Sequence, residues 1–264
     1  QRDRDPQALG GVNAAVQGND KKVVELVMRG AEPNYLEEGS VPMLLWTLCA
    51  DKEEGFEALL KAGADPNLGG TGHGKGYGLL GASWRGQGTI VRKGWSATVM
   101  AAGTEKPEFL RLALYHGGDP DAQKGEDPVG ENRPLLQAAD EGLFDNVKTL
   151  VAAGADINVH NGTHSAPWLA IAATGRYDIA LWLVEQGYSH DLEYLARGVE
   201  GRHVSLDSPL QRAKEHLIEL LRARGMQFPT VILQRRIDER VIPLEHVGDL
   251  ISGRRNVLDY PEKV

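Results

Sequence analysis

Apolar residues along this chain come in pairs of short runs, each spaced as one face of a helix requires. The pattern is clearest in residues 134–154, where one run covers residues 135–139 and the next covers residues 147–151. Within each run the apolar residues recur at helical intervals, so two helices are predicted here. Helix boundaries and a tight reversal are indicated by Pro134, Gly142 and Gly154.

The same pair of runs returns along the chain, and each pair is followed by a turn that varies around Gly-Ala-Asp-Pro-Asn. Successive turns are separated by 33, 54, 37, 33 and 38 residues, and they begin at Gly30, Gly63, Gly117, Gly154, Gly187 and, in a weak form, Gly225. A period near 33 residues predicts a stack of repeated supersecondary units.

These turns, together with the alanine pairs in the first helices, resemble the ankyrin-repeat family. The likeness covers residues 9–191, although the family's Thr-Pro-Leu-His start is poorly matched, for example by Arg133-Pro134-Leu135-Leu136. The resemblance implies an all-α ankyrin-repeat solenoid of five to six helix–turn–helix units. We therefore expect repeats over residues 1–191 and a degenerate terminal repeat with a capping region over residues 192–264.

A glycine-rich insertion over residues 69–93 lies between the second and third of these repeats. From Pro66 to Thr104 the sequence has no Asp or Glu, while aromatic residues alternate with cations. Such a loop suits a partner-binding surface, although it could equally tuck flexibly against the helices. The candidate contact residues here are His73, Lys75, Tyr77, Trp84, Arg85, Arg92 and Trp95.

A phosphate site is the third interpretation of this insertion. Residues 69–75 fit Gly-x-x-x-x-Gly-Lys, but Gly76 replaces the Ser or Thr that would hold magnesium. No strand and no helix is predicted on either side, so the match is weak.

Members of the ankyrin family bind other proteins through the turn tips and the concave helix face. That resemblance implies further contact residues outside the insertion, namely Tyr35, His160, His164 and Trp168. Trp168 could instead serve packing between repeats. His160 and His164 are four residues apart, but they lie in a predicted loop, which favours a contact surface over a metal site.

Charge and composition argue against several classes of function. The net charge of −8 argues against general binding to nucleic acid, and no apolar run approaches the length of a membrane span. The single cysteine, Cys49, excludes an intrachain disulfide, and no catalytic or cofactor motif is present. We expect no cofactor, no metal and a monomer in the absence of its partner. A signal peptide removed before Gln1 would place the protein in the periplasm; otherwise we expect it in the cytoplasm.

The carboxy-terminal region departs from the repeat. Ser208-Pro209 predicts the start of a strong helix, and residues 244–251 predict a short one. A cap over the end of the stack is the first interpretation, and a second binding surface is the alternative, using Arg235, Arg236, Arg254 and Arg255.

Taken together, the sequence predicts a protein–protein interaction module and not an enzyme. The specific hypothesis is an inhibitor, such as an immunity protein that neutralises a bacterial toxin or effector enzyme. An adaptor is the alternative within the binding class. A phosphate- or nucleotide-binding enzyme that uses His73 and Lys75 is the alternative outside it.

Overall fold

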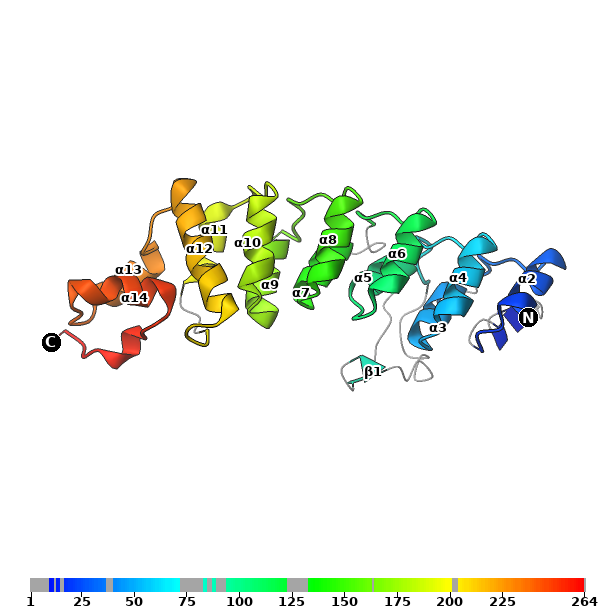
Figure 1. Cartoon of the computed structure of the whole chain (residues 1–264), viewed down its shortest axis with the longest axis horizontal. Helices are drawn as coiled ribbons and strands as arrows, with labels where there is room; N and C mark the ends of the chain where they lie inside the picture. Colours follow the sequence, from blue (N-terminus) through cyan, green and yellow to red (C-terminus); the bar gives the residue numbers. More distant parts are fainter. Residues whose placement is uncertain are drawn as a thin grey trace. The chain divides into compact units, whose positions relative to one another are not determined.

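The computed structural model describes residues 10–11, 13–14, 17–36, 40–71, 83–84, 87–88, 94–122, 133–162, 164–200 and 204–263. Over these residues the fold is helical, apart from one short pair of strands (Figure 1). The chain divides into two compact units. The first comprises Gln1–Ala138 and Asp145–Asp156, and the second comprises Ala139–Phe144 and Ile157–Val264.

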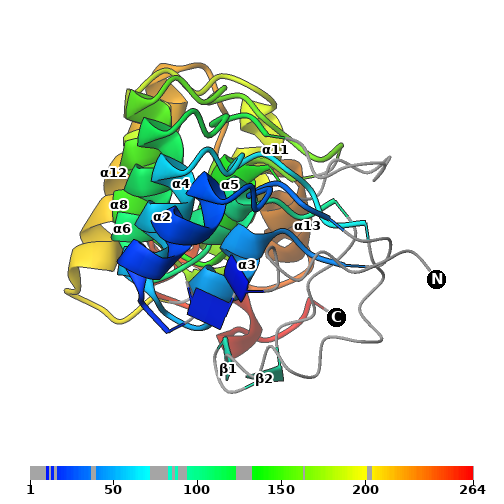
Figure 2. The same cartoon turned by 90° about the vertical axis from the view of Figure 1, so that its right-hand side faces the viewer.

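The first unit is built from paired helices. Its helices are α2 (Asp20–Met28), α3 (Met43–Cys49), α4 (Glu53–Lys61), α5 (Ala97–Ala102) and α6 (Pro107–Tyr115), followed by most of α7 (Pro134–Asp140) and α8 (Phe144–Ala152). Within a pair, α3 packs against α4 and α5 against α6. Between pairs, α3 packs against α5, while α2, α4 and α6 pack in a row (Figure 2).

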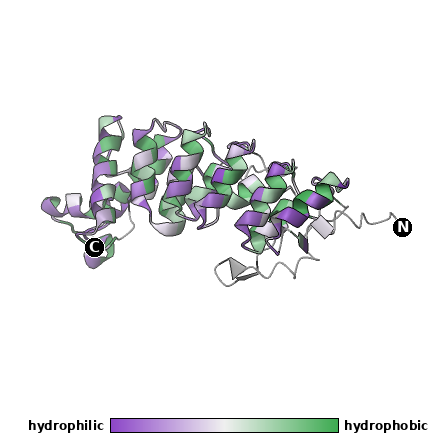
Figure 3. Cartoon of the chain, turned by 45° about the vertical axis from the view of Figure 1, so that its right-hand side comes forward, coloured by the Kyte–Doolittle hydropathy of each residue, from purple (hydrophilic) through white to green (hydrophobic). Residues whose placement is uncertain are grey.

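Apolar side chains fill the space between these two rows. Phe56 of α4 meets Phe109 of α6 edge to face, with ring centroids 5.1 Å apart. Both rings are buried, as expected for a helix that turns one apolar stripe toward its neighbours and leaves polar residues outside (Figure 3). Asn146 is buried too, and its amide donates to the carbonyls of Ala102 and Thr104 at 2.9 and 2.8 Å, which ties α8 to the end of α5.

The second unit repeats this arrangement. It contains α9 (Ala166–Thr174), α10 (Tyr177–Glu185), α11 (Leu192–Val199), α12 (Pro209–Ala223), α13 (Val231–Asp238) and α14 (Val247–Ser252), with the short 3-10 helices η1 (Leu244–His246) and η2 (Val257–Asp259). Here α9 packs against α10 and α11, α12 packs against α10 and α11, and α14 packs against α12. First helices again contact first helices, and second helices contact second helices.

The recurring turns are joined by a ladder of side-chain hydrogen bonds, one turn to the next. Asn34 accepts from the Asp65 backbone N–H at 2.7 Å, and Asn67 accepts from that of Asp119 at 2.8 Å. Asp121 accepts from the N–H of Asp156 at 2.9 Å. In the second unit, the Asn158 side chain accepts from the Ser189 N–H at 2.8 Å, in the turn before α11. The last residue of each turn motif is therefore the residue that fixes the next turn.

The insertion leaves and re-enters the helical stack at one place. The Gly70 N–H donates to the Trp95 carbonyl at 3.1 Å, and the Gly94 N–H donates to the Gly70 carbonyl at 2.7 Å. Within the insertion, β1 (Ser83–Trp84) pairs antiparallel with β2 (Gln87–Gly88). A Cβ on Gly69 would lie 2.9 Å from the Gly94 carbonyl oxygen, so only glycine fits this crossing without a shift.

Candidate functional site

A tight turn at residues 160–165 presents two of the predicted contact residues. His160 and Ser165 form a bridge at its ends, and the Asn161 N–H donates to the His164 carbonyl at 3.0 Å. The Asn161 side chain accepts from the His164 N–H at 2.8 Å, and Gly162 supplies the positive φ of 89° that the reversal needs. The Gly162 N–H also donates to His160 Nδ1 at 3.1 Å, which orients that imidazole.

His160 stacks on an imidazole from the following turn. The rings of His160 and His190 are parallel within 1°, with centroids 4.1 Å apart. The turn ladder places His190, because Asn158 Oδ1 accepts from the backbone N–H groups of Ser189 and His190 at 2.8 and 3.1 Å. The repeated asparagine thus positions a ring as well as a turn.

His164 begins a row of three stacked rings. Its imidazole lies 4.0 Å from the Trp168 indole at an interplanar angle of 14°, and that indole lies 5.7 Å from the Tyr194 ring at 26°. Trp168 is on α9 and Tyr194 is on α11, two helices in contact. A Cβ on Gly198 would lie 3.0 Å from Trp168 Cδ1, so the missing side chain at 198 lets the indole lie against α11.

We call these five rings the aromatic surface; all belong to the second unit. His160 and His190 are exposed, while the other three rings are half-buried, so each ring keeps area that a partner can contact. Stacking fixes their orientation before any partner binds. Rings held in this way offer flat apolar faces with polar edges, the chemistry that dominates protein interfaces.

The same geometry opposes a metal site at the two predicted histidines. His160 Nδ1 already accepts the Gly162 N–H, and the His160 and His164 rings stack on different partners. Across the part of the chain that the structure describes, no group of three or more His, Cys, Asp or Glu side chains is placed to hold a metal ion.

The structure brings only some of the predicted contact residues together. His160, His164 and Trp168 share the aromatic surface, whereas Tyr35 and Trp95 are half-buried in the first unit. Trp84 contributes its backbone to β1, and nothing is described of its side chain. The other candidates lie outside the described residues; these are His73, Lys75, Tyr77, Arg85 and Arg92.

Two residues of the aromatic surface were missed by sequence reasoning, His190 and Tyr194. A signal for Tyr194 was present, because Trp168 and Tyr194 are each the third residue of their helix, α9 and α11. Aligning the degenerate sixth unit on the fifth would have paired them. His190 lies in a turn whose motif has faded to Gly-Tyr-Ser-His-Asp, so it had no comparable signal.

The expected basic surface near the carboxy terminus is largely neutralised. Arg235 pairs with Glu239 at 3.5 Å, Arg254 with Glu215 at 2.7 Å and Arg255 with Asp249 at 3.0 Å. These arginines therefore offer a partner much less positive charge than their sequence clustering suggested.

No protein-family model matches this chain, and no curated protein matches it. Among the helices in the described residues, none has both the length and the apolarity that crossing a membrane demands. The function must therefore be inferred from the chain's own residues.

Proposed function

We propose that this chain is an ankyrin-type repeat protein that binds another protein through its aromatic surface. The observation that carries the proposal is the pre-stacked row of His164, Trp168 and Tyr194, with the His160–His190 pair presented from the adjoining turns. In support of the scaffold, first helices pack on first helices and second helices on second helices within each unit. A motif residue also bonds each turn to the next.

The arrangement of the rings favours binding over a purely structural role. Core aromatic residues of this chain, such as Tyr177 and Phe56, are fully buried, whereas Trp168 and Tyr194 keep exposed area beside a tight turn. Trp and Tyr are enriched among the residues that dominate binding energy. Rings that are already ordered lose less conformational entropy when a partner docks, which strengthens binding.

The single cysteine, Cys49, is a poor candidate for a catalytic nucleophile. Burial raises the pKa of Cys49 to about 11, so the nucleophilic thiolate is scarce at neutral pH. The competing enzyme hypothesis depends on His73 and Lys75, which lie outside the described residues.

Within the binding class we favour a stoichiometric inhibitor, such as an immunity protein directed against a toxin or effector enzyme. The support is the lack of a catalytic motif in the sequence and an elaborated loop that could enter a partner's active site. An adaptor is the alternative. The two differ in one measurable respect, since an inhibitor abolishes its partner's activity in a one-to-one complex and an adaptor leaves that activity intact.

The binding proposal is tested by affinity purification from the native host with the intact chain as bait, followed by calorimetry on the captured protein. Trp168→Ala and Tyr194→Ala should each weaken binding by roughly 30-fold, the effect of losing about 2 kcal/mol at a hot spot. Circular dichroism would confirm that each variant remains folded.

Tyr115→Ala is the matched control. Tyr115 is a tyrosine on α6 with 85% of its surface exposed, in the other compact unit, so its removal should leave affinity within about twofold. If the folded Trp168 and Tyr194 variants bind as tightly as the control, the aromatic surface is not the interface.

A further inference from the structure

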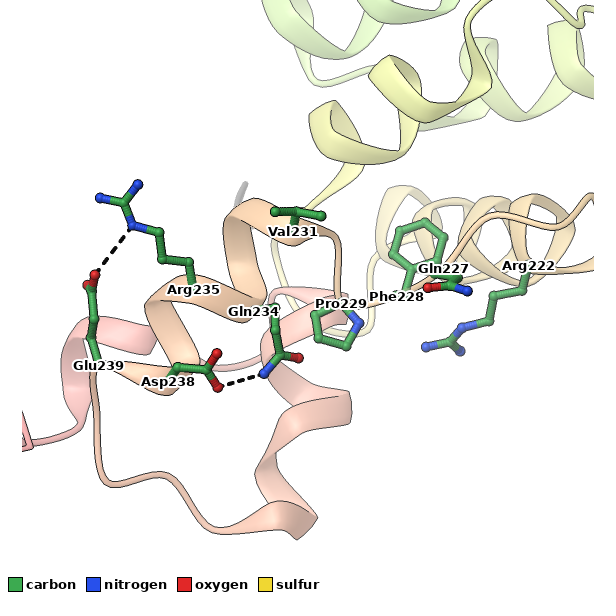
Figure 4. A pocket seen from close by; sticks show the side chains of 9 residues that line it. All are labelled: Arg222, Gln227, Phe228, Pro229, Val231, Gln234, Arg235, Asp238 and Glu239. Atoms are coloured by element: carbon green, nitrogen blue, oxygen red, sulfur yellow. Dashed lines mark hydrogen bonds and ion pairs between the residues drawn. The ribbon is translucent and has the colours of Figure 1, made fainter.

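A groove of about 870 Å³ lies at the carboxy-terminal end of the second unit (Figure 4). One wall is a single face of α13, formed by residues at helical spacing, Val231, Gln234, Arg235 and Asp238. The other wall is the last turn of α12 and residues 227–229. The volume lies in the range of sites that hold a small molecule or a few residues of peptide.

The middle of the groove is apolar. Phe228 and Pro229 lie beside Val231, which is 76% exposed although it is a β-branched apolar residue. Exposed apolar area that is concave and flanked by charges marks an interaction site more strongly than a scattered surface valine does.

Arg222 gives the groove a positive end with a fixed orientation. Its guanidinium lies 5.5 Å from the centroid of the Phe228 ring, so the flat group is held over an aromatic face. No carboxylate among the described residues lies within ion-pair distance of Arg222, unlike Arg240, which pairs with Glu262 at 3.0 Å. Burial raises the pKa of the nearby Glu200, and its hydrogen bonds from the Thr230 N–H and hydroxyl, with the charges of Lys214 and Arg222, only partly oppose that rise.

The opposite end of the groove is negative. Asp238 accepts a hydrogen bond from the Gln234 amide at 2.8 Å, and Glu239 is 3.5 Å from the Arg235 guanidinium (Figure 4). Arg235 offsets the charge of Glu239, so the net charge of this end is that of Asp238. Asp238 would repel a ligand with a run of acidic residues, whereas a single carboxylate at the Arg222 end meets no such repulsion.

We propose that this groove binds a short segment of a partner protein that carries one Asp or Glu beside a large apolar side chain. The carboxylate takes two N–H groups of the Arg222 guanidinium in the bidentate geometry that arginine favours. The apolar side chain packs on Phe228, Pro229 and Val231. This site is independent of the aromatic surface and could serve the same partner or another.

The test selects a phage-displayed library of random linear peptides against the intact chain. Peptides with one acidic residue next to Leu, Ile, Phe or Trp should be enriched. A synthetic peptide of the selected sequence should bind Arg222→Gln roughly tenfold more weakly than the unaltered chain. Replacing the peptide's Glu by Gln should cost a similar factor on the unaltered chain and less than about twofold on Arg222→Gln, because the two changes remove one shared contact.

Two control variants separate the groove from other surfaces. Arg236→Gln removes the same charge from α13 outside the groove lining, and Trp168→Ala alters the aromatic surface; both should leave peptide affinity unchanged. The proposal is overturned if no peptide is selected, if Arg222→Gln binds the peptide normally, or if the Glu→Gln change in the peptide costs the same factor on both proteins.

Discussion

At the scale of single residues, the most unusual group is a lysine buried in the second unit. Lys214 of α12 has no exposed surface, and its ammonium lies 5.4 Å from the centroid of the Tyr177 ring. Burial lowers the pKa of Lys214 to about 8, while the charges of Glu200 and Glu215 oppose that shift. Glu200 is itself only 8% exposed, so its charge acts on Lys214 from within the core.

This burial predicts a rise in stability at alkaline pH. In the unfolded chain the pKa of a lysine is about 10.4, above the pKa in the fold, so between the two values the unfolded chain binds more protons. The free energy of unfolding should therefore increase with pH across that interval. The Lys214 contribution should reach roughly 2 kcal/mol between pH 7 and about pH 9.5. Urea denaturation at both pH values measures the change.

Lys214→Met isolates this contribution, because methionine matches the stem of lysine and does not titrate. Burial raises the pKa of Cys49 to about 11, and that thiol changes stability in the opposite direction, but it does so equally in both proteins. The increase in the free energy of unfolding with pH should thus be smaller in Lys214→Met by the roughly 2 kcal/mol that Lys214 contributes. Equal gains in the two proteins would show that Lys214 is not buried as the structure places it.

At the scale of elements, the hydrogen bonds between successive turns explain why the turn motif so often ends in asparagine, as at Asn34, Asn67 and Asn158. Asn67 accepts from the Asp119 N–H at 2.8 Å and donates to the Gly117 carbonyl at 2.8 Å, so it satisfies both a donor and an acceptor of the next turn. Asp121 occupies the same place one turn later, and it can only accept, from Asp156 N–H. The chain thus contains a natural comparison of amide with carboxylate.

Two substitutions at Asn67 should therefore differ in cost. Asn67→Ala loses these two hydrogen bonds and the one accepted from the Thr98 hydroxyl at 3.2 Å, and it should lower the free energy of unfolding by about 2 kcal/mol. Asn67→Asp keeps the accepted bonds and should cost roughly half as much. Denaturant unfolding of the three proteins gives the values. Equal costs would mean that the accepted bonds contribute nothing, because Asn67→Asp removes only the bond donated to Gly117.

Spacing predicted the helix pairs well, because periodic apolar residues and glycine turns are local signals. The helix predicted after Ser208 begins at Pro209, and Ser208 caps it by accepting from the Gln211 N–H at 3.1 Å. Trp182 lies on α10 at the spacing of its buried residues, yet it is half-buried, with its ring packed edge to face on Phe144 at a centroid distance of 5.8 Å. Spacing predicts which face of a helix a residue lies on, but how deeply a ring on that face is buried depends on the helices packed against it.

The candidate site was less predictable than the fold. His164 and Trp168 lie four residues apart, and the sequence offered both as contact residues without indicating that their rings stack. Two further rings of the aromatic surface, His190 and Tyr194, come from the following repeat, whose turn motif is only weakly kept. Stacking between repeats depends on where two helices cross, which spacing in the sequence does not give. The groove beside Arg222 had no signal at all, because its walls meet only through the path of residues 227–229.

At the scale of the whole molecule, it can be tested whether the insertion is needed for partner binding and not for the fold. Gly70 accepts from Gly94 N–H and donates to Trp95 O, and the Thr71 N–H donates to the Ser40 carbonyl at 3.0 Å. These bonds hold both ends of the insertion at the helix pairs. A deletion of residues 70–88 would remove some of these bonds along with the loop, so it could not separate binding from folding.

Replacing residues 72–93 by two glycines keeps the bonds at both ends and should leave the fold intact. Thr71 follows Gly70 in the chain and Gly94 is hydrogen-bonded to Gly70, so a short linker can join Thr71 to Gly94, and a shorter loop has a lower entropic cost of closure. We expect unchanged helix content by circular dichroism and a thermal midpoint within about 2 °C of the unaltered chain, no more than a 1 kcal/mol loss would cause in a unit of this size. Calorimetry with the captured partner then assigns the interface. A large loss of affinity would show that the insertion contributes to the interface, whereas full affinity in the shortened protein would contradict the prediction that the loop binds the partner.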